Sequence, residues 1–443
     1  MSVSDFIFAA NSGSLNSIIV KYIVILCAFG AVVLSAVPAN GAAPLDTLSL
    51  SVSAADSIFQ TQNLQLLANH MNVDVAAAQI ISARLWDNPV FYSEVNIWNP
   101  LTHKPFDVNN GGQLDLSIQQ LFKIGGEHHR LTQYNKANKK AVEYAYFDLL
   151  RNLKYELRTD LFQLNSLIKT GGIYQTEIEK VESLEKALND AYSKNNIPLK
   201  DLVRIQSTLF QYHADYNQLQ NQISDLQSKL HQMLRLPLEK YIVPALNSDI
   251  EKDFNALNLD TLYTIALSNR ADLKADETQI LAAEWNLKYQ RSVAVPDLTV
   301  GFDYFNNGAA SFNNYYGLQL SMPLPVFNRN QGGIKAAKAN LTQQKYQAED
   351  THEKTVNEVN SAYAKLVQTA RIDMEQQKKN NESFDKLMQN ILGLYVRKEI
   401  SLKDLADYMD IYKTQAKAFY DYTAQFQSAR EELNFAVGKA ILK

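Results

Sequence analysis

The sequence has almost no cysteine and no excess of basic residues, and each absence excludes a class of function. Cys27 is the only cysteine among 443 residues, so an internal disulfide or a thiolate metal site is excluded. Lys and Arg number 43 against 47 Asp and Glu, which leaves no basic surface for a nucleic-acid partner. The sequence also shows no nucleotide-binding loop, metal-ligand cluster or activated nucleophile, so we expect neither an enzyme nor a bound cofactor.

The N-terminal residues predict a secretory leader. Lys21 precedes an apolar run over residues 22–34, and Ala39-Asn40-Gly41 supplies the small residues that precede a cleavage site. We therefore assign residues 1–41 to a signal peptide, whose removal would also remove the one cysteine. A membrane anchor is the alternative, but the run is short for a span and Pro38 follows it.

Two regions show the period-two alternation of half-buried strands. Residues 90–121 and 298–322 each contain two such segments joined by a loop, which predicts two β-hairpins. Pro323 and Pro325 end the last strand, because proline cannot donate a hydrogen bond to a sheet. Gly332-Gly333 then lead into a long polar helix. This stretch is therefore a strand-to-helix corner.

The rest of the chain is predicted to be helical. The first long helix, from Glu127 to about Lys194, contains no proline and would be on the order of 100 Å long, too long for a globular core. The second is expected to continue from about Ile334 to Arg397. We assign shorter helices to residues 42–89 and 259–295. Long helical hairpins are assigned to 127–234 and 333–438, with their tips near 192–202 and 395–405. A less regular connector covers 235–258.

The two halves of the chain repeat each other. Leu45-Asp46-Thr47-Leu48, which we expect to open the first helical region, matches Leu259-Asp260-Thr261-Leu262. Leu199-Lys200-Asp201-Leu202 matches Leu402-Lys403-Asp404-Leu405 at the two chain reversals. A predicted β-hairpin lies between these matches in each half. The pattern indicates a twofold internal repeat.

The repeat predicts a mainly α protein with a small β part. A strand of about nine residues can cross a bilayer when tilted. The predicted strands of one chain are too few to close a barrel, and open edges in lipid leave backbone groups unpaired, so further copies must complete the sheet. A soluble sandwich whose strands pack on helices is the alternative. The very long helices favour the oligomeric barrel, continued by an antiparallel helical barrel around water.

The corner and the reversals carry a family resemblance that extends over the mature chain. The chain resembles the TolC-like outer membrane factors, or outer membrane efflux proteins, in Pro323-Leu324-Pro325-Val326-Phe327, Gly332-Gly333, Tyr395, Ser401, Asp404, Leu405, Tyr192, Asp201 and Leu202. Lys398 and Asn195 stand where the family has glycine, and Pro198 where it has serine. The resemblance implies a homotrimer with an outer membrane β-barrel, four strands per protomer, and a long periplasmic helical barrel.

The resemblance also implies a function and partners. The chain would be the passive outer membrane exit duct of a tripartite efflux system, with metal cations or small toxic compounds as candidate substrates. A periplasmic adaptor and a proton-driven inner membrane pump would be its partners, with outer membrane lipid around the barrel. A duct for type I protein secretion is the alternative within transport. A non-transporting periplasmic coiled-coil scaffold is the alternative from another class.

The resemblance makes the reversals the periplasmic tips, which close the tunnel and meet the adaptor. Tip contact and gating are assigned to Tyr192, Lys200, Asp201, Tyr395, Arg397, Ser401, Lys403 and Asp404. Local helix capping is the alternative for Ser401 and Asp404, since a carboxylate in the first turn complements the helix dipole.

Three acidic residues are candidate lumen groups. Glu94, Asp115 and Asp303 lie on the polar faces of the predicted strands, so a barrel would direct them inward, where they would favour cations. A generic polar lumen is the alternative. His128-His129 are adjacent on a predicted helix and point about 100° apart, so we expect no metal site there.

Overall fold

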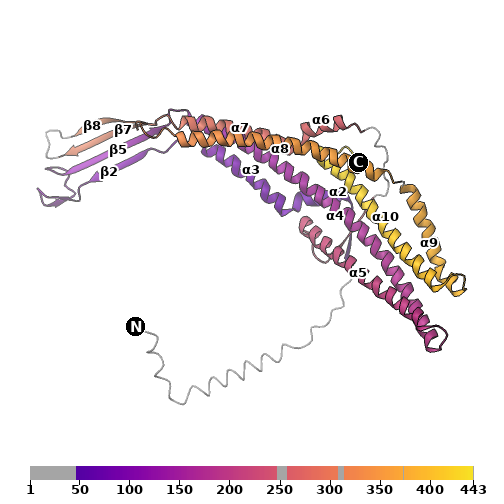
Figure 1. The fold of residues 1–443 in the computed structure, drawn as a ribbon. Helices are drawn as coiled ribbons and strands as arrows, with labels where there is room; N and C mark the ends of the chain where they lie inside the picture. The colour runs from indigo at the N-terminus through magenta and orange to yellow at the C-terminus, as the bar shows by residue number, and fades with distance from the viewer. Residues whose placement is uncertain (1–45, 247–256, 308–313, 373, 443) are drawn as a thin grey trace, which may run out of the picture. The chain divides into compact units, whose positions relative to one another are not determined.

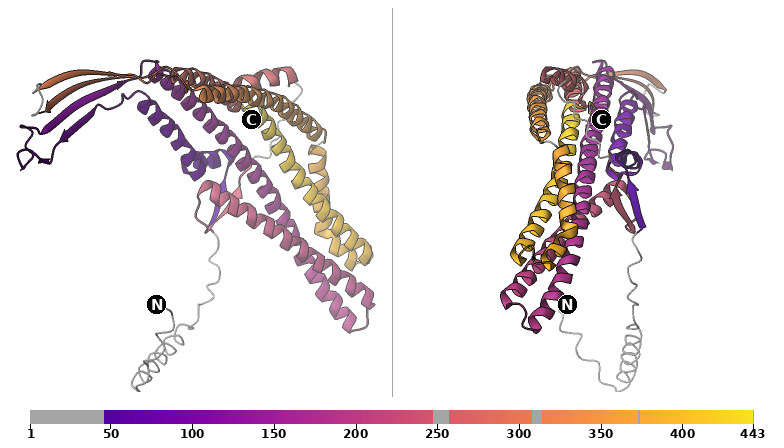
Figure 2. Two further views of the ribbon diagram at one scale, coloured as in Figure 1. Left: turned by 60° about the vertical axis from the view of Figure 1, so that its left-hand side comes forward. Right: turned by 90° about the vertical axis from the view of Figure 1, so that its right-hand side faces the viewer.

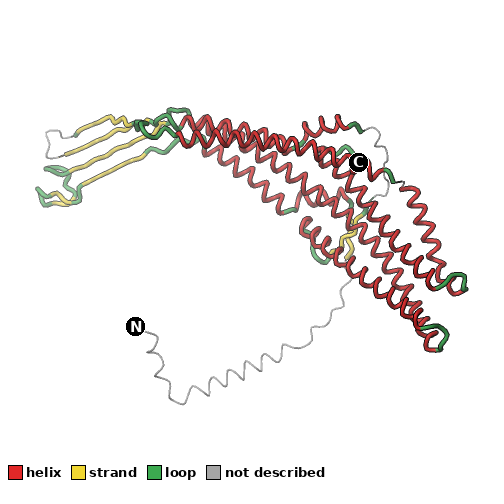
Figure 3. Tube along the Cα trace, viewed as in Figure 1, coloured by secondary structure: helices red, strands yellow, loops and turns green. Residues whose placement is uncertain are grey.

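The computed structural model describes residues 46–246, 257–307, 314–372 and 374–442 (Figure 1). Most of them are helical and a small part forms strands, as the sequence predicts (Figure 3). The predicted signal peptide and part of the predicted connector lie outside the described residues.

The described chain forms two units. The small unit comprises residues 46–47 and 239–241, in which the Lys240 ammonium pairs with the Asp46 carboxylate. The larger unit comprises residues 48–238 and 242–442.

The elements repeat the order of strands and helices once along the chain. The strands are β1 (Asp46–Leu50), β2 (Val90–Val95), β3 (Trp98–Asn99), β4 (Lys104–Pro105), β5 (Gln113–Phe122), β6 (Lys240–Pro244), β7 (Leu298–Asn307) and β8 (Tyr315–Ser321). The helices are α2 (Val52–Gln62), α3 (Leu64–Ser82), α4 (Glu127–Ser193), α5 (Leu199–Leu234), α6 (Leu259–Asn269), α7 (Ala271–Ser292), α8 (Gln331–Ala370), α9 (Met374–Val396) and α10 (Leu402–Val437).

The strands of the two predicted hairpins form one antiparallel sheet in the order β2-β5-β7-β8 (Figure 1). The central pair, β5 and β7, joins the first half of the chain to the second. Within the described residues, β2 and β8 are the edge strands of this sheet.

The helices next to the sheet follow the same order as the strands. α3 packs on α4, α4 on α7, and α7 on α8 (Figures 1 and 2). Along the chain α3 precedes β2, α4 follows β5, α7 precedes β7 and α8 follows β8. Each helix therefore continues its own strand, and α3 and α8 are the outer members of the row.

The expected helix start at residues 45–48 is wrong. Asp46–Leu50 forms strand β1, in which Leu48 and Leu50 alternate with Thr47 and Ser49, and β1 pairs with β6 from the connector. α2 begins only at Val52, where the Ser51 side chain accepts a hydrogen bond from the Ala54 N–H at 3.2 Å. The counterpart of α6 in the first half is thus α2, which has the same length of 11 residues.

The second long helix is not continuous as predicted. It is interrupted near Arg371 and Ile372, between α8 and α9. Neither proline nor glycine marks this point in the sequence. The two segments differ in their partners, because α8 packs on α6, α7 and α10, whereas α9 packs on α10. A short β3–β4 pair within the predicted loop after β2 was likewise not expected.

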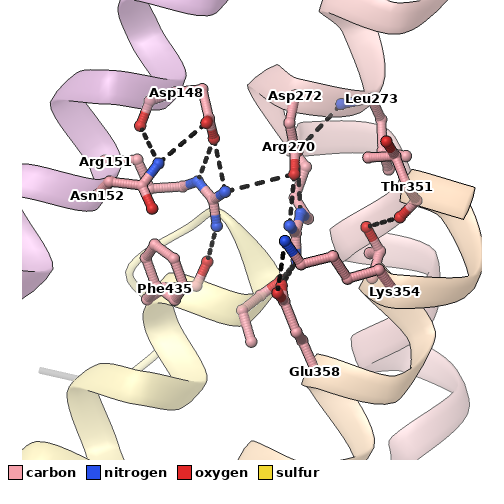
Figure 4. A network of polar contacts seen from close by, with 12 residues as sticks. Asp148, Arg151, Asn152, Arg270, Asp272, Leu273, Thr351, Lys354, Glu358 and Phe435 are labelled. Carbon is pink, nitrogen blue, oxygen red and sulfur yellow. Dashed lines mark hydrogen bonds and ion pairs between the residues drawn. The ribbon is translucent and has the colours of Figure 1, made fainter. Parts of the chain in front are cut away.

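A buried cation joins four helices where the second half begins (Figure 4). Arg270, only 2% exposed, is the N-cap of α7. Its guanidinium donates to Asp272, to Glu358 of α8 at 2.6 Å and to the Ala436 carbonyl of α10 at 3.2 Å. Arg151 of α4 reaches Asp272 at 3.5 Å from the other side. The network fixes α4, α7, α8 and α10 against one another.

The network keeps Asp272 ionised. Burial alone would raise the pKa of Asp272, but the hydrogen bond and charge of Arg270, together with Arg151, lower it below the ordinary value. A carboxyl group whose folded pKa is lowered contributes stability above its unfolded pKa of about 3.9 and loses it as the pH falls through the folded value. The network should therefore weaken only in strong acid, below about pH 4.

Removing the guanidinium should destabilise the helical part. We expect Arg270→Ala to lower the free energy of unfolding by about 3–5 kcal/mol, because Asp272 is left charged and partly buried. Lys354→Ala is the control, since the exposed Lys354 lies 3.8 Å from the same Glu358, and a surface pair contributes about 0–1 kcal/mol. Thermal unfolding followed by circular dichroism in detergent compares the two; equal melting temperatures would contradict the role assigned to Arg270.

Candidate functional site

One face of the four-stranded sheet is apolar and exposed. Phe91, Ile118, Phe302 and Leu318 lie side by side across the four strands. Each is at least half exposed, from 50% for Ile118 to 75% for Leu318. In the described chain the sheet strands pack extensively only on one another. A soluble sandwich would cover this face with helices, and the described helices do not do so.

The opposite face carries the predicted acidic residues. Glu94 lies directly opposite Asp115 of β5. Asp303 lies opposite Ser117, which follows Asp115 by two residues on β5. The structure therefore brings all three carboxylates to one face.

The same face carries an amide bridge. The Gln119 side chain donates to the Gln319 side chain at 2.8 Å, across Gly301 of the strand between them. The polar face is thus continuous over the three strands β5, β7 and β8.

The strand-to-helix corner differs slightly from its prediction. Pro323 and Pro325 follow β8, as expected, but α8 begins at Gln331, so Gly332 and Gly333 form its first turn instead of preceding it. The N-cap Asn330 has a left-handed φ of 53°.

Asn330 connects the corner to α7. Its side-chain amide donates to the carbonyl of Gln290 at 2.7 Å and to the Gln290 side chain at 2.9 Å. Gly333 lies directly beneath this contact: a Cβ there would lie 2.3 Å from Asn330 Oδ1 and 2.7 Å from Gln290 Oε1. Gly332 faces open space. Only the second glycine of the pair is needed for packing.

The two chain reversals have the same backbone geometry. Asn195 and Lys398, at the positions where the family has glycine, have left-handed φ values of 56° and 61°. Asn195 donates its N–H to the Tyr192 carbonyl and Lys398 to the Tyr395 carbonyl, both at 2.9 Å. The turns thus keep one geometry without glycine, at the cost of strain at Lys398, since a lysine rarely adopts this conformation.

The charged residues at the tips bond locally. Ser401 and Asp404 form a capping box, in which Asp404 N–H donates to Ser401 Oγ at 3.1 Å and Ser401 N–H to the Asp404 carboxylate at 3.0 Å. The Ser401 hydrogen bonds lower the pKa of Asp404. Arg397 pairs with Glu399 two residues on, at 2.5 Å. Lys200 and Lys403 are exposed.

The two tips share an apolar core. Leu188 and Leu202 of the first hairpin and Ile391, Leu402 and Leu405 of the second belong to one buried cluster. Tyr395 packs against this cluster. Burial is the main cause that raises the pKa of Tyr395, and the nearby Asp201 carboxylate is the second. Tyr192 remains exposed. Within one protomer, apolar packing holds the tips together.

One buried cation between the hairpins was not anticipated from the sequence. Lys413 of α10 lies 3.1 Å from both Asp215 of α5 and Asp410, with its ammonium 4.6 Å from the centre of the Tyr212 ring. Lys413 is only 9% exposed. Its partners lie about 200 residues apart in sequence, so no local pattern could have revealed the site.

The described residues contain no metal-ligand cluster, and none of their helices has the length and apolar character required for a membrane span. His128 lies against Trp86, with ring centres 5.1 Å apart, and His129 against Trp285 at 6.0 Å. The two histidines have separate aromatic neighbours.

Solved structures with a similar fold include outer membrane channels. The chain is similar to CmeC of Campylobacter jejuni, with a TM-score of 0.72, 14% identity and coverage of 88% of this chain and 87% of that one. It is also similar to MtrE of Neisseria gonorrhoeae, with a TM-score of 0.66, 14% identity and coverage of 90% and 93%. CusC, described in relation to transmembrane channel formation, gives a TM-score of 0.69, 16% identity and coverage of 91% and 96%. No curated relative matches the chain.

A family model matches part of the second half of the chain. Residues 262–439 match the family model described as outer membrane efflux protein. This match over part of the chain confirms the resemblance seen in the sequence. Members are outer membrane channels with a large periplasmic helical part, not enzymes, and they act as trimers with adaptor proteins and inner membrane pumps.

Substitution by alanine should have opposite effects on stability at the two corner glycines. Gly332→Ala should stabilise α8 by about 0.5–1 kcal/mol, because alanine favours the helix and its methyl group meets nothing. Gly333→Ala should instead destabilise the protein. Its methyl group would displace the Asn330 side chain from Gln290, and each hydrogen bond lost costs about 1 kcal/mol of stability, which exceeds the gain in helix propensity. Thermal unfolding of both variants tests this. Equal stabilisation by the two substitutions would refute the packing role of Gly333.

The strained lysine at the second tip should be improved by glycine. Lys398→Gly should stabilise the reversal by about 1 kcal/mol, because glycine adopts a positive φ without a Cβ clash. Lys194→Gly is the control, since Lys194 ends the corresponding helix with a φ of -91°. Hydrogen exchange of the tip amides should slow in the first variant only. Unchanged or faster exchange in Lys398→Gly would show that the turn is not strained.

Proposed function

We propose that the chain is the outer membrane channel of a tripartite efflux system. Three copies contribute their four-stranded sheets to one barrel, and their helices form a tunnel on the periplasmic side. Substrates leave passively through this duct, driven by a proton-driven inner membrane pump that acts through a periplasmic adaptor. Metal cations and small toxic compounds are the substrate classes that we assign to it.

A single observation carries the proposal: within the described residues, the sheet has an exposed apolar face, a polar face and two edge strands that pair on one side only. An exposed apolar surface of this kind suits lipid rather than water. Free edges in lipid must be paired, because hydrocarbon satisfies no backbone N–H or C=O group. Closure with further copies meets both requirements and turns the face of Glu94, Asp115 and Asp303 toward the lumen.

The mass and conductance of the purified protein test the proposal. The mature chain is extracted from outer membranes in detergent, its mass is measured by light scattering, and single channels are recorded in planar bilayers. A trimer that conducts is the expected result. A soluble, monomeric and non-conducting protein would refute the duct and favour the periplasmic scaffold.

The lumen carboxylates should make the channel prefer cations. Neutralising them together as Glu94→Gln, Asp115→Asn and Asp303→Asn should bring the cation-to-anion permeability ratio close to one, because the lumen then carries no acidic side chain from these positions. Asp260→Asn, on the exposed side of α6, is the control and should leave the ratio unchanged. The permeability ratio of each variant is measured from its reversal potential in a salt gradient. An anion-selective parent channel would exclude this role for the acids.

The tip residues are proposed to contact the adaptor and to hold the resting tunnel closed. If charge keeps the tips shut, Asp201→Ala combined with Asp404→Ala should raise the resting conductance. Ser401→Ala distinguishes an effect of charge from an effect of helix capping, because it removes the capping hydroxyl but keeps the Asp404 carboxylate. Losing the cap should lower the stability of the helix by about 1 kcal/mol. Equal conductance in the double variant and the parent protein would exclude charge as the closing force, and an equal rise in Ser401→Ala would assign the effect to capping.

A further inference from the structure

The loop between β2 and β5 is folded, and its large apolar side chains are exposed. It comprises residues 96–112, contains the β3–β4 pair and lies at the end of the sheet away from the helices (Figure 1). Ile97 is 73% exposed, Leu101 69%, Phe106 64% and Trp98 54%. An exposed apolar cluster of this kind marks a surface that meets something other than water. We call residues 96–112 the β2–β5 loop.

The apolar side chains lie on both sides of the β3–β4 pair. Trp98 lies opposite Pro105, and the Phe106 N–H donates to the Ile97 carbonyl at 3.1 Å, so Ile97 and Phe106 form the adjacent level of the pair. Because successive residues of a strand point to opposite sides, Trp98 lies on one side of the pair and Ile97 on the other. A protein that docks on one side would leave the other side exposed, whereas a lipid layer around the loop covers both.

The backbone of the loop is satisfied from within. Asn99 is completely buried, and its side-chain amide donates to the carbonyls of Asp107 at 3.2 Å and Asn109 at 2.9 Å. The Asn96 side chain accepts the Gln113 N–H at 2.6 Å and donates to the same Asp107 carbonyl at 3.1 Å. Water satisfies such groups in an ordinary surface loop, but an apolar medium does not. The loop therefore has the internal hydrogen bonds that contact with lipid requires.

The apolar face of β2 continues into the loop. Phe91 and Val95 lie on the exposed apolar face of the sheet, and Ile97 follows Val95 at the same spacing of two residues. Lys104 of β4 is exposed as well. Aromatic side chains together with lysine are typical of the boundary between hydrocarbon and lipid headgroups, where the ring lies in the apolar layer and the ammonium reaches the phosphates.

We propose that the β2–β5 loop inserts its apolar side chains into the outer leaflet of the outer membrane, with Lys104 at the phosphate of an anionic lipid. The helical part of the protein is periplasmic, so the opposite end of the sheet faces the outer leaflet. The occupant of the loop surface is thus membrane lipid, and the loop fixes the depth of the barrel in the bilayer. This inference rests on the proposed duct.

Quenching of tryptophan fluorescence by brominated lipid tests the contact. The chain has three tryptophans, so Trp86→Phe with Trp285→Phe leaves Trp98 as the only one. The purified protein with these changes is reconstituted into vesicles of phosphatidylcholine and phosphatidylglycerol whose acyl chains carry bromine. The control replaces all three tryptophans by phenylalanine and adds Phe210→Trp. Phe210 is 75% exposed but belongs to helix α5, at the other end of the molecule from the loop (Figure 1).

Brominated lipid should reduce the Trp98 emission by about half or more and leave the emission of the Phe210→Trp control unchanged, because bromine quenches only on contact and Trp98 lies at the lipid boundary. Unquenched Trp98 in a protein that is trimeric and conducts would overturn the lipid contact and leave the duct intact. The loop would then face another copy of the chain or an external protein. Equal quenching of the control would also overturn the assignment. A monomeric, non-conducting preparation would instead refute the proposed function.

The role of Lys104 is tested in the same vesicles with bromine on only one of the two lipids. Bromine on phosphatidylglycerol should quench Trp98 more strongly than the same amount on phosphatidylcholine, because the ammonium concentrates anionic lipid beside the loop. Lys104→Gln should make the two equal. Lys354→Gln, at an exposed lysine of α8, is the control and should keep the difference. Equal quenching by the two lipids before any change at Lys104 would refute the headgroup contact.

Discussion

An edge strand has backbone N–H and C=O groups that no neighbouring strand satisfies, and hydrocarbon offers no replacement for them. Most of the architecture follows from this constraint. β2 and β8 are the free edges of the described sheet, and the sheet itself is held together by the central pair β5 and β7. Since β5 belongs to the first half of the chain and β7 to the second, the two halves of the repeat are joined at the sheet. The helices that continue the strands then inherit their order, which places α3 and α8 at the outside.

The helical part is stabilised at separate points along its length. Among the described residues, buried side chains form separate groups, such as the tip cluster and the cluster of α6, α8 and α10. Buried and partly buried ion pairs add further contacts between the helices. Arg270 connects the helices at the start of the second half, Arg158 joins α4 to Glu431 of α10 at 2.6 Å, and Lys413 joins α10 to α5. Paired charges at these points define which helices meet and at which level.

The sequence allowed the elements to be predicted wherever their determinants are local. Alternation identified the four sheet strands, and the stretch without proline identified α4. The two reversals were located by the match of Leu199-Lys200-Asp201-Leu202 with Leu402-Lys403-Asp404-Leu405. β1 was missed because its partner β6 lies about 190 residues away. The break after α8 was missed because nothing in Arg371 and Ile372 interrupts a helix. Of the candidate site, the shared face of the three acids followed from period two, whereas the networks of Arg270 and Lys413 depend on partners scattered over the chain.

The Arg270 network also determines when the helical part can become rigid as the chain is synthesised. Two of its acceptors are backbone carbonyls at the end of α10: Ala436, which binds Arg270, and Phe435, which binds Arg151 at 2.7 Å. A nascent chain that stops before these residues holds both arginines without those acceptors. Gly438, with a left-handed φ of 72°, lies against Arg270 and completes its cover. The packing of α4, α7 and α8 through this network is thus completed only when α10 is present.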